Sequence, residues 1–197
     1  MKDIDIRQAL FAGVFKDHQA EPDTLVVEEL GLNYGEVRVD VAVINGSIHG
    51  YEIKSQKDTL ERLPAQLTVY SASLDYVTLV VHESHVTKAL EMIPRWWGVQ
   101  VVKGTPEAVQ FKERRKSRRN PKQDLECTLR LLWKDEAIQI LENAGLAKGI
   151  RSKSKEVINK RILESLQPDA IRDNVRAALK GRTQWRNVIN LPAQAQR

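Results

Sequence analysis

The feature that most constrains the fold is an alternating segment between residues 36 and 55. In the run EVRVDVAVI, four valines alternate with Arg38, Asp40 and Ala42, which is the pattern of a half-buried β-strand. Asn45-Gly46 follows, and a second β-rich run, SIHGYEIKS, comes next. Because Asn-Gly between two such runs is a strong hairpin signal, we predict two antiparallel strands joined by a tight turn.

Three polar residues of this hairpin are candidates for chemistry. Asp40 lies on the first predicted strand, and Glu52 and Lys54 lie on the second. Residues two apart on a strand point to the same face, and at about 3.3 Å per residue they are roughly 6 to 7 Å apart. The side chains of Glu52 and Lys54 can therefore converge on one substrate atom.

The register of the hairpin decides whether Asp40 joins them. With a two-residue loop, Asp40 would pair with Tyr51 and Glu52 would lie on the other face. With a three-residue loop, Ile44 pairs with Ile48, and Asp40 lies opposite Glu52 on the same face. A bulge at Gly50 would also restore the match. The catalytic hypothesis thus predicts a particular hairpin geometry.

Two facing carboxylates repel each other unless a cation neutralises them. Hard oxygen ligands without a nearby His or Cys favour Mg²⁺ or Mn²⁺ over zinc. Such an ion polarises a phosphate oxygen and lowers the pKa of bound water, while Lys54 orients that water or stabilises charge on the phosphate oxygens. The chemistry expected of Asp40, Glu52 and Lys54 is therefore phosphodiester hydrolysis.

The segment RVDVAVINGSIHGYEIKS resembles the motif of the PD-(D/E)xK nuclease superfamily, in which an Asp and a Glu-x-Lys on adjacent strands bind the metal. Val39 replaces the Pro of the motif's name, which many members lack. The stretch from Val26 to Val81, with the later RWWG, also resembles a group of small bacterial and phage nuclease-like proteins of poorly defined role. The resemblance covers roughly residues 1–111 and implies a restriction-endonuclease-like fold.

The predicted helix after the hairpin strengthens the resemblance. Gln66 and Tyr70 are four residues apart and share one helical face. They are similar to the Gln-x-x-x-Tyr motif of RecB-type nucleases, which implies that they support the site and contact the DNA strand. The family also uses an acidic residue near the first helix, for which Glu29 is the candidate and Glu28 the alternative.

The rest of the first part alternates between helical and strand patterns. We predict a helix over residues 4–17, a strand over 24–30, a helix beginning near Asp58 or Thr59, and a strand buried on both faces over 76–82. A helix ended by Pro94 and two short strands follow. The expected fold class is α/β, with a mixed sheet flanked by helices in the order αβββαβ and a small all-α segment after it.

Charge divides the chain into two parts. Residues 1–111 contain 10 Lys and Arg against 16 Asp and Glu, a net charge of −6, whereas residues 112–197 contain 21 against 10, a net charge of +11. We therefore expect a nuclease-like domain over 1–111, a basic linker over 112–123, and a helical region over 124–197 that binds nucleic acid or docks a partner. The candidate nucleic-acid contacts are Arg38, Arg114, Arg115, Lys116, Arg118 and Arg119.

Three amphipathic helices are predicted in the basic region, the first over residues 125–144 and the last ending at Gly181. These helices are also a candidate surface for a homodimer or a larger complex. At least one of the adjacent tryptophans, Trp96 and Trp97, is expected to lie in the core. His82 lies at the end of a predicted strand, and we expect it to cap a turn or lie on the surface.

Cysteine content and hydropathy narrow the cellular setting. The single cysteine, Cys127, excludes an intramolecular disulfide, and its apolar neighbours predict a buried thiol. The N-terminus lacks the pattern of a signal peptide, and no later stretch approaches the roughly 20 apolar residues of a membrane span. We expect a cytoplasmic protein with no membrane partner.

The sequence as a whole predicts an Mg²⁺- or Mn²⁺-dependent nuclease, most directly a deoxyribonuclease of bacterial or phage origin. Two alternatives are a catalytically silent DNA-binding module and a protein-interaction module on a nuclease-like scaffold. A solvated strand face is the competing interpretation of Asp40, Glu52 and Lys54, but it does not account for the Gln66-Tyr70 helix that follows in the expected order.

Overall fold

The computed structural model of the 197-residue chain describes residues 1–183 and 185. A six-stranded sheet in the order β1-β2-β3-β4-β5-β6 forms its centre. The two central pairings, β3 with β4 and β4 with β5, are parallel, and the other three are antiparallel. The strands are β1 (Leu25–Leu32), β2 (Val37–Ile44), β3 (Ile48–Lys54), β4 (Tyr76–His82), β5 (Gly98–Thr105) and β6 (Ala108–Arg115).

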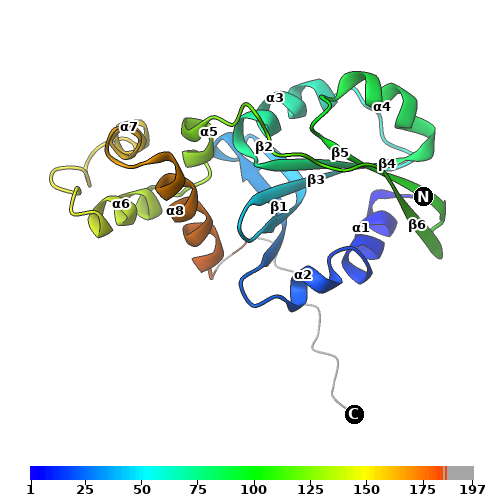
Figure 1. The fold of residues 1–197 in the computed structure, drawn as a ribbon, viewed down its shortest axis with the longest axis horizontal. Coiled ribbons are helices and arrows are strands. Elements are labelled where there is room, and N and C mark those ends of the chain that lie inside the picture. Colours follow the sequence, from blue (N-terminus) through cyan, green and yellow to red (C-terminus); the bar gives the residue numbers. More distant parts are fainter. Residues whose placement is uncertain (184, 186–197) are drawn as a thin grey trace, which may run out of the picture.

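Helices cover both faces of this sheet, and four more lie at one end of it (Figure 1). One face carries the two N-terminal helices, and the other carries α3 and α4. The predicted α/β fold class with a mixed sheet is confirmed, as is the order αβββαβ of its core. The helices are α1 (Asp3–Ala12), α2 (Lys16–Ala20), α3 (Leu63–Ser73), α4 (Val86–Met92), α5 (Leu125–Leu129), α6 (Lys134–Asn143), α7 (Lys155–Ser165) and α8 (Pro168–Gly181).

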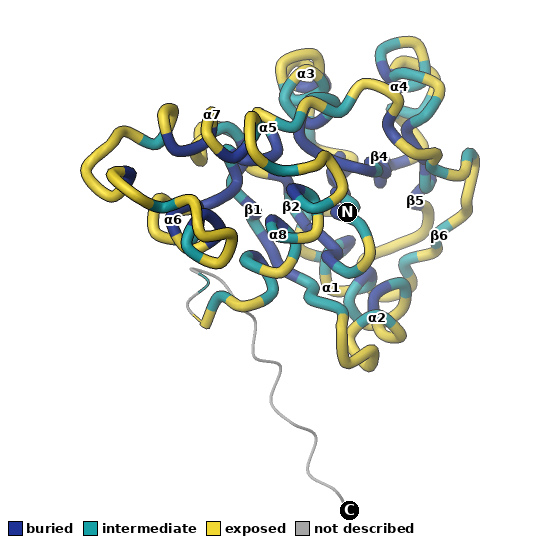
Figure 2. The backbone as a smooth tube through the Cα atoms, turned by 60° about the vertical axis from the view of Figure 1, so that its left-hand side comes forward, coloured by how far each residue is buried: buried dark blue, intermediate teal, exposed yellow. Residues whose placement is uncertain are grey.

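The sheet separates two apolar cores. The smaller one packs Ile6 and Leu10 of α1 against Val41, Val43 and neighbouring residues of the sheet. The larger one joins the opposite face of the sheet to α3, and it continues without interruption into the C-terminal helices. Figure 2 shows the buried central strands between more exposed helices. Strand β4, apart from its first residue, is buried along its length because both its faces are covered, as predicted.

The hairpin has the three-residue loop that the catalytic hypothesis requires. Ile44 pairs with Ile48, and the Asn45 N–H donates to the Ser47 carbonyl at 3.0 Å. The ladder ends at the pair of Val41 and Tyr51, so continuing its register aligns Asp40 with Glu52. The predicted register is therefore confirmed from the Ile44–Ile48 pair onward, with Asp40 and Glu52 just beyond its last pair, and neither the two-residue loop nor a bulge at Gly50 is present.

Several boundaries differ from the sequence-based expectation. The first predicted helix is two helices, α1 and α2, and α3 begins at Leu63 because Pro64 occupies its first turn. The first C-terminal helix is also two, α5 and α6, which are separated by residues 130–133. Cys127 is half-buried rather than buried. Each difference concerns where a helix begins or how deeply it packs, which depends on distant contacts.

Residues 112–123, expected as a linker, are tied to the folded core. Their first four residues belong to β6. Asn120 is buried, and its Nδ2 donates to the carbonyls of Ser71 and Leu74 at 2.6 and 2.8 Å. These bonds hold the connection against the end of α3, so the C-terminal helices approach the sheet through a fixed segment.

No helix among the described residues is long and apolar enough to cross a membrane. Trp97 is fully buried and Trp96 packs half-buried beside it, as expected for a pair with at least one core member. His82 caps the turn that follows β4, because its Nδ1 accepts the Ser84 N–H at 3.3 Å.

Candidate functional site

The polar residues of the hairpin open into a cavity of about 610 Å³ between α1, the β1–β2 turn and the start of α3. Its walls include Asp40, Glu52 and Lys54 together with Glu29 and Gln66. With Arg38, which also lines it, six of the predicted site residues are brought together, although they come from four separate elements. This cavity is called the acidic cavity below.

Glu52 is the most enclosed member of the group, with only 1% of its surface exposed. Its Oε1 accepts bonds from Lys54 Nζ at 2.6 Å and from Gln66 Nε2 at 2.7 Å. On the other side, Tyr70 Oη lies 2.5 Å from Glu52 Oε2. A buried carboxylate is tolerated only when it is paired and hydrogen-bonded, and these three partners supply both conditions.

Gln66 and Tyr70 act on Glu52 together. They are one turn apart on α3, and Gln66 Nε2 lies 3.4 Å from Tyr70 Oη. Tyr70 Oη also lies 2.7 Å from the Arg38 carbonyl, so the hydroxyl links α3 to both β2 and β3. Burial, and then the nearby Glu52 carboxylate, raise the pKa of Tyr70 above its usual value, which keeps the phenol protonated.

Asp40 lies where β2 and β3 separate. Its Oδ2 accepts the Ile53 N–H at 2.6 Å, so it replaces the main-chain partner that the ladder no longer provides. Burial and the charge of Glu52 raise the pKa of Asp40 to about 7, against the lowering effects of Ile53 and Arg7. The negative charge of Glu52 therefore acts on Asp40, and it favours the protonated form of that carboxyl.

The cation beside Asp40 is Arg7 of α1, whereas Lys54 is the cation beside Glu52. Its guanidinium donates to Asp40 Oδ1 at 3.3 Å, to the Asp40 carbonyl at 3.0 Å, and to Asp3 Oδ1 at 3.2 Å. It also reaches Glu28 Oε1 at 3.1 Å and Glu29 Oε1 at 3.3 Å. Although burial opposes the charge, the acids Asp3 and Asp40 raise the pKa of Arg7 above its ordinary value.

Sequence reasoning missed Arg7. Its four acidic partners are spread over residues 3 to 40, and only its spacing of four from Asp3 is visible along the chain. Both candidates for the third acid contact Arg7, but Glu29 lines the acidic cavity and Glu28 does not. Glu29 also has a left-handed backbone (φ 54°), which is unusual for a residue other than glycine.

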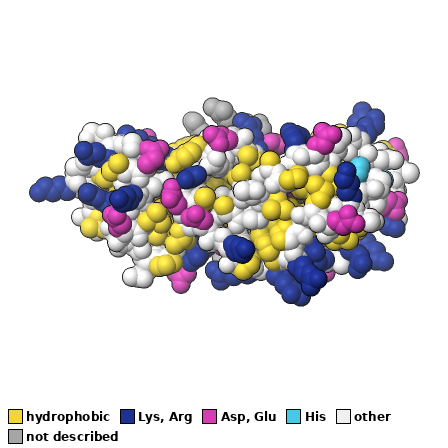
Figure 3. All heavy atoms as spheres, turned by 90° about the horizontal axis from the view of Figure 1, so that it is seen from above, with side chains coloured by type: hydrophobic (Ala, Val, Ile, Leu, Met, Phe, Trp, Pro, Cys, Tyr) yellow, Lys and Arg dark blue, Asp and Glu magenta, His cyan; other side chains and the backbone are white. Residues whose placement is uncertain are grey.

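The basic contacts expected near residue 115 lie elsewhere. Arg115 donates to the carbonyls of Trp97 and Pro94 at 2.7 and 3.0 Å, so its guanidinium connects β6 to the loop between α4 and β5. The other four, none of which lines a described cavity, are exposed: Arg114, Lys116, Arg118 and Arg119. On the face in Figure 3, Lys and Arg side chains occur at both ends of the molecule, with acids among them.

Over the described part of the chain, no three or more His, Cys, Asp or Glu side chains already form a set that could hold a metal ion. The donor chemistry nonetheless fits a hard divalent cation. Asp40 and Glu52 offer carboxylate oxygens, and a carboxylate has about four acceptor positions, of which Asp40 uses two. Burial, and then the charge of Glu52, raise the pKa of Asp40 more than Ile53 and Arg7 lower it, so the ionised carboxylate is disfavoured without a further cation.

The fold and the site define an α/β protein with a mixed sheet and an enclosed carboxylate-lysine centre. The chain belongs to the family described as Bacteriophage P4 protein cII, which matches residues 4–196. It is 27% identical over 146 residues to Protein cII of Enterobacteria phage P4, an alignment that covers 74% of this chain and 55% of that protein. The chain thus spans about half the length of this curated relative.

A similarity to one solved structure is more distant. The SPO1766 protein of unknown function from Silicibacter pomeroyi is 18% identical, with a TM-score of 0.41, over 81% of this chain and 93% of that chain. A TM-score of this size carries no argument about function.

Proposed function

We propose that the chain is a metal-dependent nuclease of the PD-(D/E)xK type that hydrolyses phosphodiester bonds, with DNA as the preferred substrate. The observation that carries this proposal is the convergence of Asp40, Glu52 and Lys54 on one cavity from two paired strands. A solvated strand face would not bury Glu52 and Lys54 to 1% and 4% exposure.

Asp40 and Glu52, with Glu29 or Glu28, are the residues that would hold Mg²⁺ or Mn²⁺. Bound there, the ion supplies Lewis-acid activation of a phosphate oxygen and of water. Asp40 must be ionised to bind it, so the pKa of about 7 at Asp40 makes binding stronger above neutral pH.

Lys54 provides positive charge on the same wall. Its ammonium is held 2.6 Å from Glu52 Oε1 and 3.1 Å from Gln66 Oε1, which fixes its direction before a substrate arrives. A preorganised ammonium stabilises the negative charge that develops on phosphate oxygens without reorganising during the reaction. The third N–H of the ammonium remains available for this contact.

Arg7 has a different role in this proposal. It neutralises Asp40 in the free protein, and the same carboxylate is needed by the divalent cation. Ion binding therefore competes with the contact between Arg7 and Asp40, and the guanidinium would keep its contact with Asp3, which is not among the proposed ligands of the ion.

The network around Arg7 also favours a second candidate function, a catalytically silent nucleic-acid-binding module. If Arg7 permanently takes the place of the metal ion, the site is a structural ion-pair network and the protein only binds. This candidate predicts strongly salt-dependent DNA binding and no cleavage that depends on a divalent ion.

Incubation with linear, circular, single-stranded and branched DNA, and with RNA, separates the two candidates. We expect cleavage of at least one DNA substrate in Mg²⁺ or Mn²⁺ and none in EDTA. Lys54→Ala and Asp40→Ala should abolish cleavage, whereas Lys57→Ala, an exposed neighbour outside the cavity, should not. Full metal-dependent cleavage by either site variant, with its circular dichroism spectrum unchanged, would contradict the nuclease proposal.

A further inference from the structure

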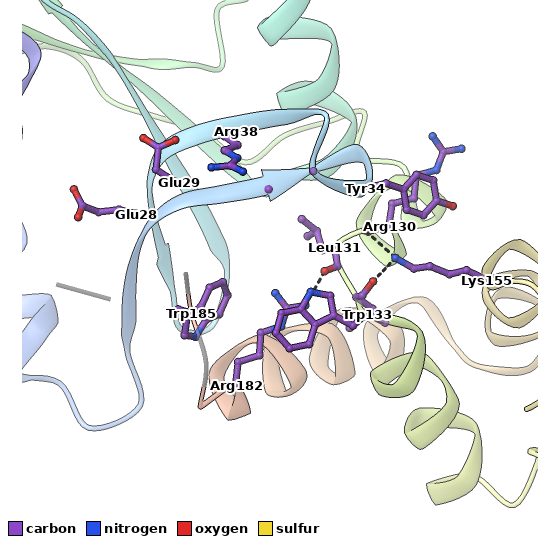
Figure 4. Close-up of a pocket in the computed structure, with 13 residues that line it drawn as sticks. Glu28, Glu29, Tyr34, Arg38, Arg130, Leu131, Trp133, Lys155, Arg182 and Trp185 are labelled. Carbon is purple, nitrogen blue, oxygen red and sulfur yellow. Dashed lines mark hydrogen bonds between the residues drawn. The ribbon is translucent and has the colours of Figure 1, made fainter. Parts of the chain in front are cut away.

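A second cavity lies next to the acidic one. It has a volume of about 420 Å³ and lies between the β1–β2 turn and the C-terminal helices (Figure 4). Glu29, Gly35 and Arg38 line both cavities, so the two adjoin at the turn. Aromatic and basic side chains dominate its wall, and we call it the aromatic-basic cavity.

Two aromatic rings of this cavity are exposed to an unusual degree. Tyr34 and Trp133 are 47% and 54% exposed, and they are the two exposed aromatic residues among the described large hydrophobic ones. Tyr34 comes from the β1–β2 turn and Trp133 from the loop before α6, which are far apart in sequence. Exposed aromatic surface that two distant segments bring to one cavity indicates a binding role, because folding alone would favour burying these rings.

The backbone under Tyr34 is strained. Asn33, Tyr34 and Gly35 all have positive φ, at 47°, 61° and 89°. Asn and Gly tolerate this conformation, but for a bulky residue such as Tyr it is unfavourable. The turn therefore holds the Tyr34 ring outward at a cost in stability, which is the pattern of a residue retained for contact with a ligand.

Positive charge surrounds the two rings. Lys155 Nζ lies 4.6 Å from the centre of the Tyr34 ring, and the Arg182 guanidinium lies 4.3 Å from the centre of the Trp133 ring. Arg182 is paired with Glu136, at 2.6 Å between Nε and Oε1. In contrast, neither Arg38 nor Lys155 forms an ion pair with any acid in the described part of the chain.

The positions of these two cations suit an anionic ligand. Lys155 is held in place by the carbonyls of Arg130 and Leu132, and burial lowers the pKa of its ammonium. Arg38 is exposed at the junction of the two cavities. A phosphate at this junction would form an ion pair with Arg38, and the neighbouring base could stack on the ring of Tyr34 or Trp133.

We propose that the aromatic-basic cavity binds a single-stranded segment of nucleic acid and leads it into the acidic cavity. Bases would stack on Tyr34 and Trp133, and Arg38 would contact a phosphate between the two cavities. A single strand fits better than a duplex because stacking needs accessible base faces, which a double helix keeps covered. The inference rests on the proposed function, since it takes nucleic acid as the substrate of the neighbouring site.

Fluorescence anisotropy with a labelled oligo-dT of about 12 nucleotides tests the inference in EDTA, where no metal-dependent cleavage occurs. We expect Trp133→Ala to weaken binding roughly 5- to 100-fold, the range that loss of one stacking contact produces. Tyr34→Asn should weaken it similarly, and Asn suits the left-handed backbone, so this variant tests the ring without adding strain. Val157→Ala, on the exposed surface of α7, is the control and should not change binding.

The salt dependence of binding tests the phosphate contact. Arg38→Ala should reduce the slope of log K against log salt by about 0.7, the value for one phosphate contact on a single strand. Lys88→Ala, exposed on α4 and outside both cavities, should leave the slope unchanged.

Three results would overturn the inference: wild-type protein that does not bind the oligonucleotide at low salt, equal affinity for the matching duplex, or undiminished binding by both aromatic variants. Loss of binding in these variants supports it even if wild-type protein never cleaves DNA. Failure of the nuclease proposal is thus read from the cleavage assay, and failure of this inference from binding without metal.

Discussion

Arg7 and Asp40 are joined twice: the Arg7 guanidinium lies 3.3 Å from Asp40 Oδ1 and 3.0 Å from the Asp40 carbonyl oxygen. The first contact neutralises the carboxylate, and the second anchors α1 to the point where β2 and β3 separate. Arg7 thereby neutralises the carboxylate that a divalent cation would need under the nuclease proposal, and the consequences of removing it differ between the two candidate functions.

Arg7→Ala should reduce the free energy of unfolding by roughly 2 to 4 kcal/mol in EDTA, because it leaves several partly buried carboxylates without their cation. Saturating Mg²⁺ should restore part of this loss, since an ion that binds only the folded state stabilises it. Urea unfolding with and without Mg²⁺ measures both effects. Lys16→Ala, exposed on α2, serves as the control. An equal loss in Mg²⁺ and in EDTA would favour the structural ion-pair network.

The pH dependence of stability should change in Asp40→Asn. The folded-state pKa of Asp40 is about 7, raised from an ordinary value of 3.8, so the folded protein binds this proton more tightly than the unfolded chain does. The contribution of protonated Asp40 to the free energy of unfolding is complete below about pH 4 and is lost as the pH rises to about 7.

In EDTA, the free energy of unfolding of the wild-type protein should therefore fall between about pH 4 and pH 7, and that of Asp40→Asn should fall less. Urea unfolding at pH 4.5, 6 and 8 gives the comparison, with Asp17→Asn on exposed α2 as the matched control. A variant whose stability follows pH as steeply as that of wild type would show that Asp40 is not the group that titrates.

Tyr70→Phe should destabilise the fold by about 1 to 3 kcal/mol, because it removes the hydroxyl beside the buried Glu52 Oε2 without opening a large cavity. Under the nuclease proposal it should also lower the cleavage rate, since Glu52 loses one of the bonds that orient it. Tyr76→Phe is the control, because no hydrogen bond of its hydroxyl occurs among the described residues. Equal unfolding midpoints for the two variants would mean that the contact between Tyr70 and Glu52 adds no stability.

Gly50 of β3 lies close to two core side chains, Leu74 just after α3 and Val39 of β2. A Cβ there would lie 2.6 Å from Leu74 Cδ1 and 3.1 Å from Val39 Cγ2, so Gly50→Ala should cost about 1 to 3 kcal/mol. In Gly46→Ala the added Cβ meets nothing within 4 Å, and the stability should change little. Thermal unfolding of the two variants checks the difference, and similar midpoints would indicate that α3 shifts freely.

The sequence predicted the hairpin site because its information is local. The alternation showed which residues share a face. The requirement that Asp40 meet Glu52 left two geometries, a three-residue loop or a bulge at Gly50, and the structure contains the three-residue loop. The proximity of Gln66 and Tyr70 could also be predicted, because a helix brings residues four apart together.

The contacts that sequence reasoning missed join distant segments. Arg7 reaches acids as far along the chain as residue 40, and Tyr34 meets Lys155 and Arg130 across a tertiary contact. No periodic pattern links such positions. The helix is likewise interrupted between α5 and α6 at residues 130–133, which line the same cavity as Tyr34. The helix propensities of these residues do not predict the interruption.

The central claim is that Asp40 and Glu52 hold one divalent cation, and calorimetric titration of Mn²⁺ into the purified protein tests it most directly. The account predicts about one ion bound per chain above pH 7, at least about ten-fold weaker binding in Asp40→Asn and Glu52→Gln, and wild-type binding in Lys57→Ala. Absence of Mn²⁺ binding, or equal affinity in wild type and both carboxylate variants, would contradict it.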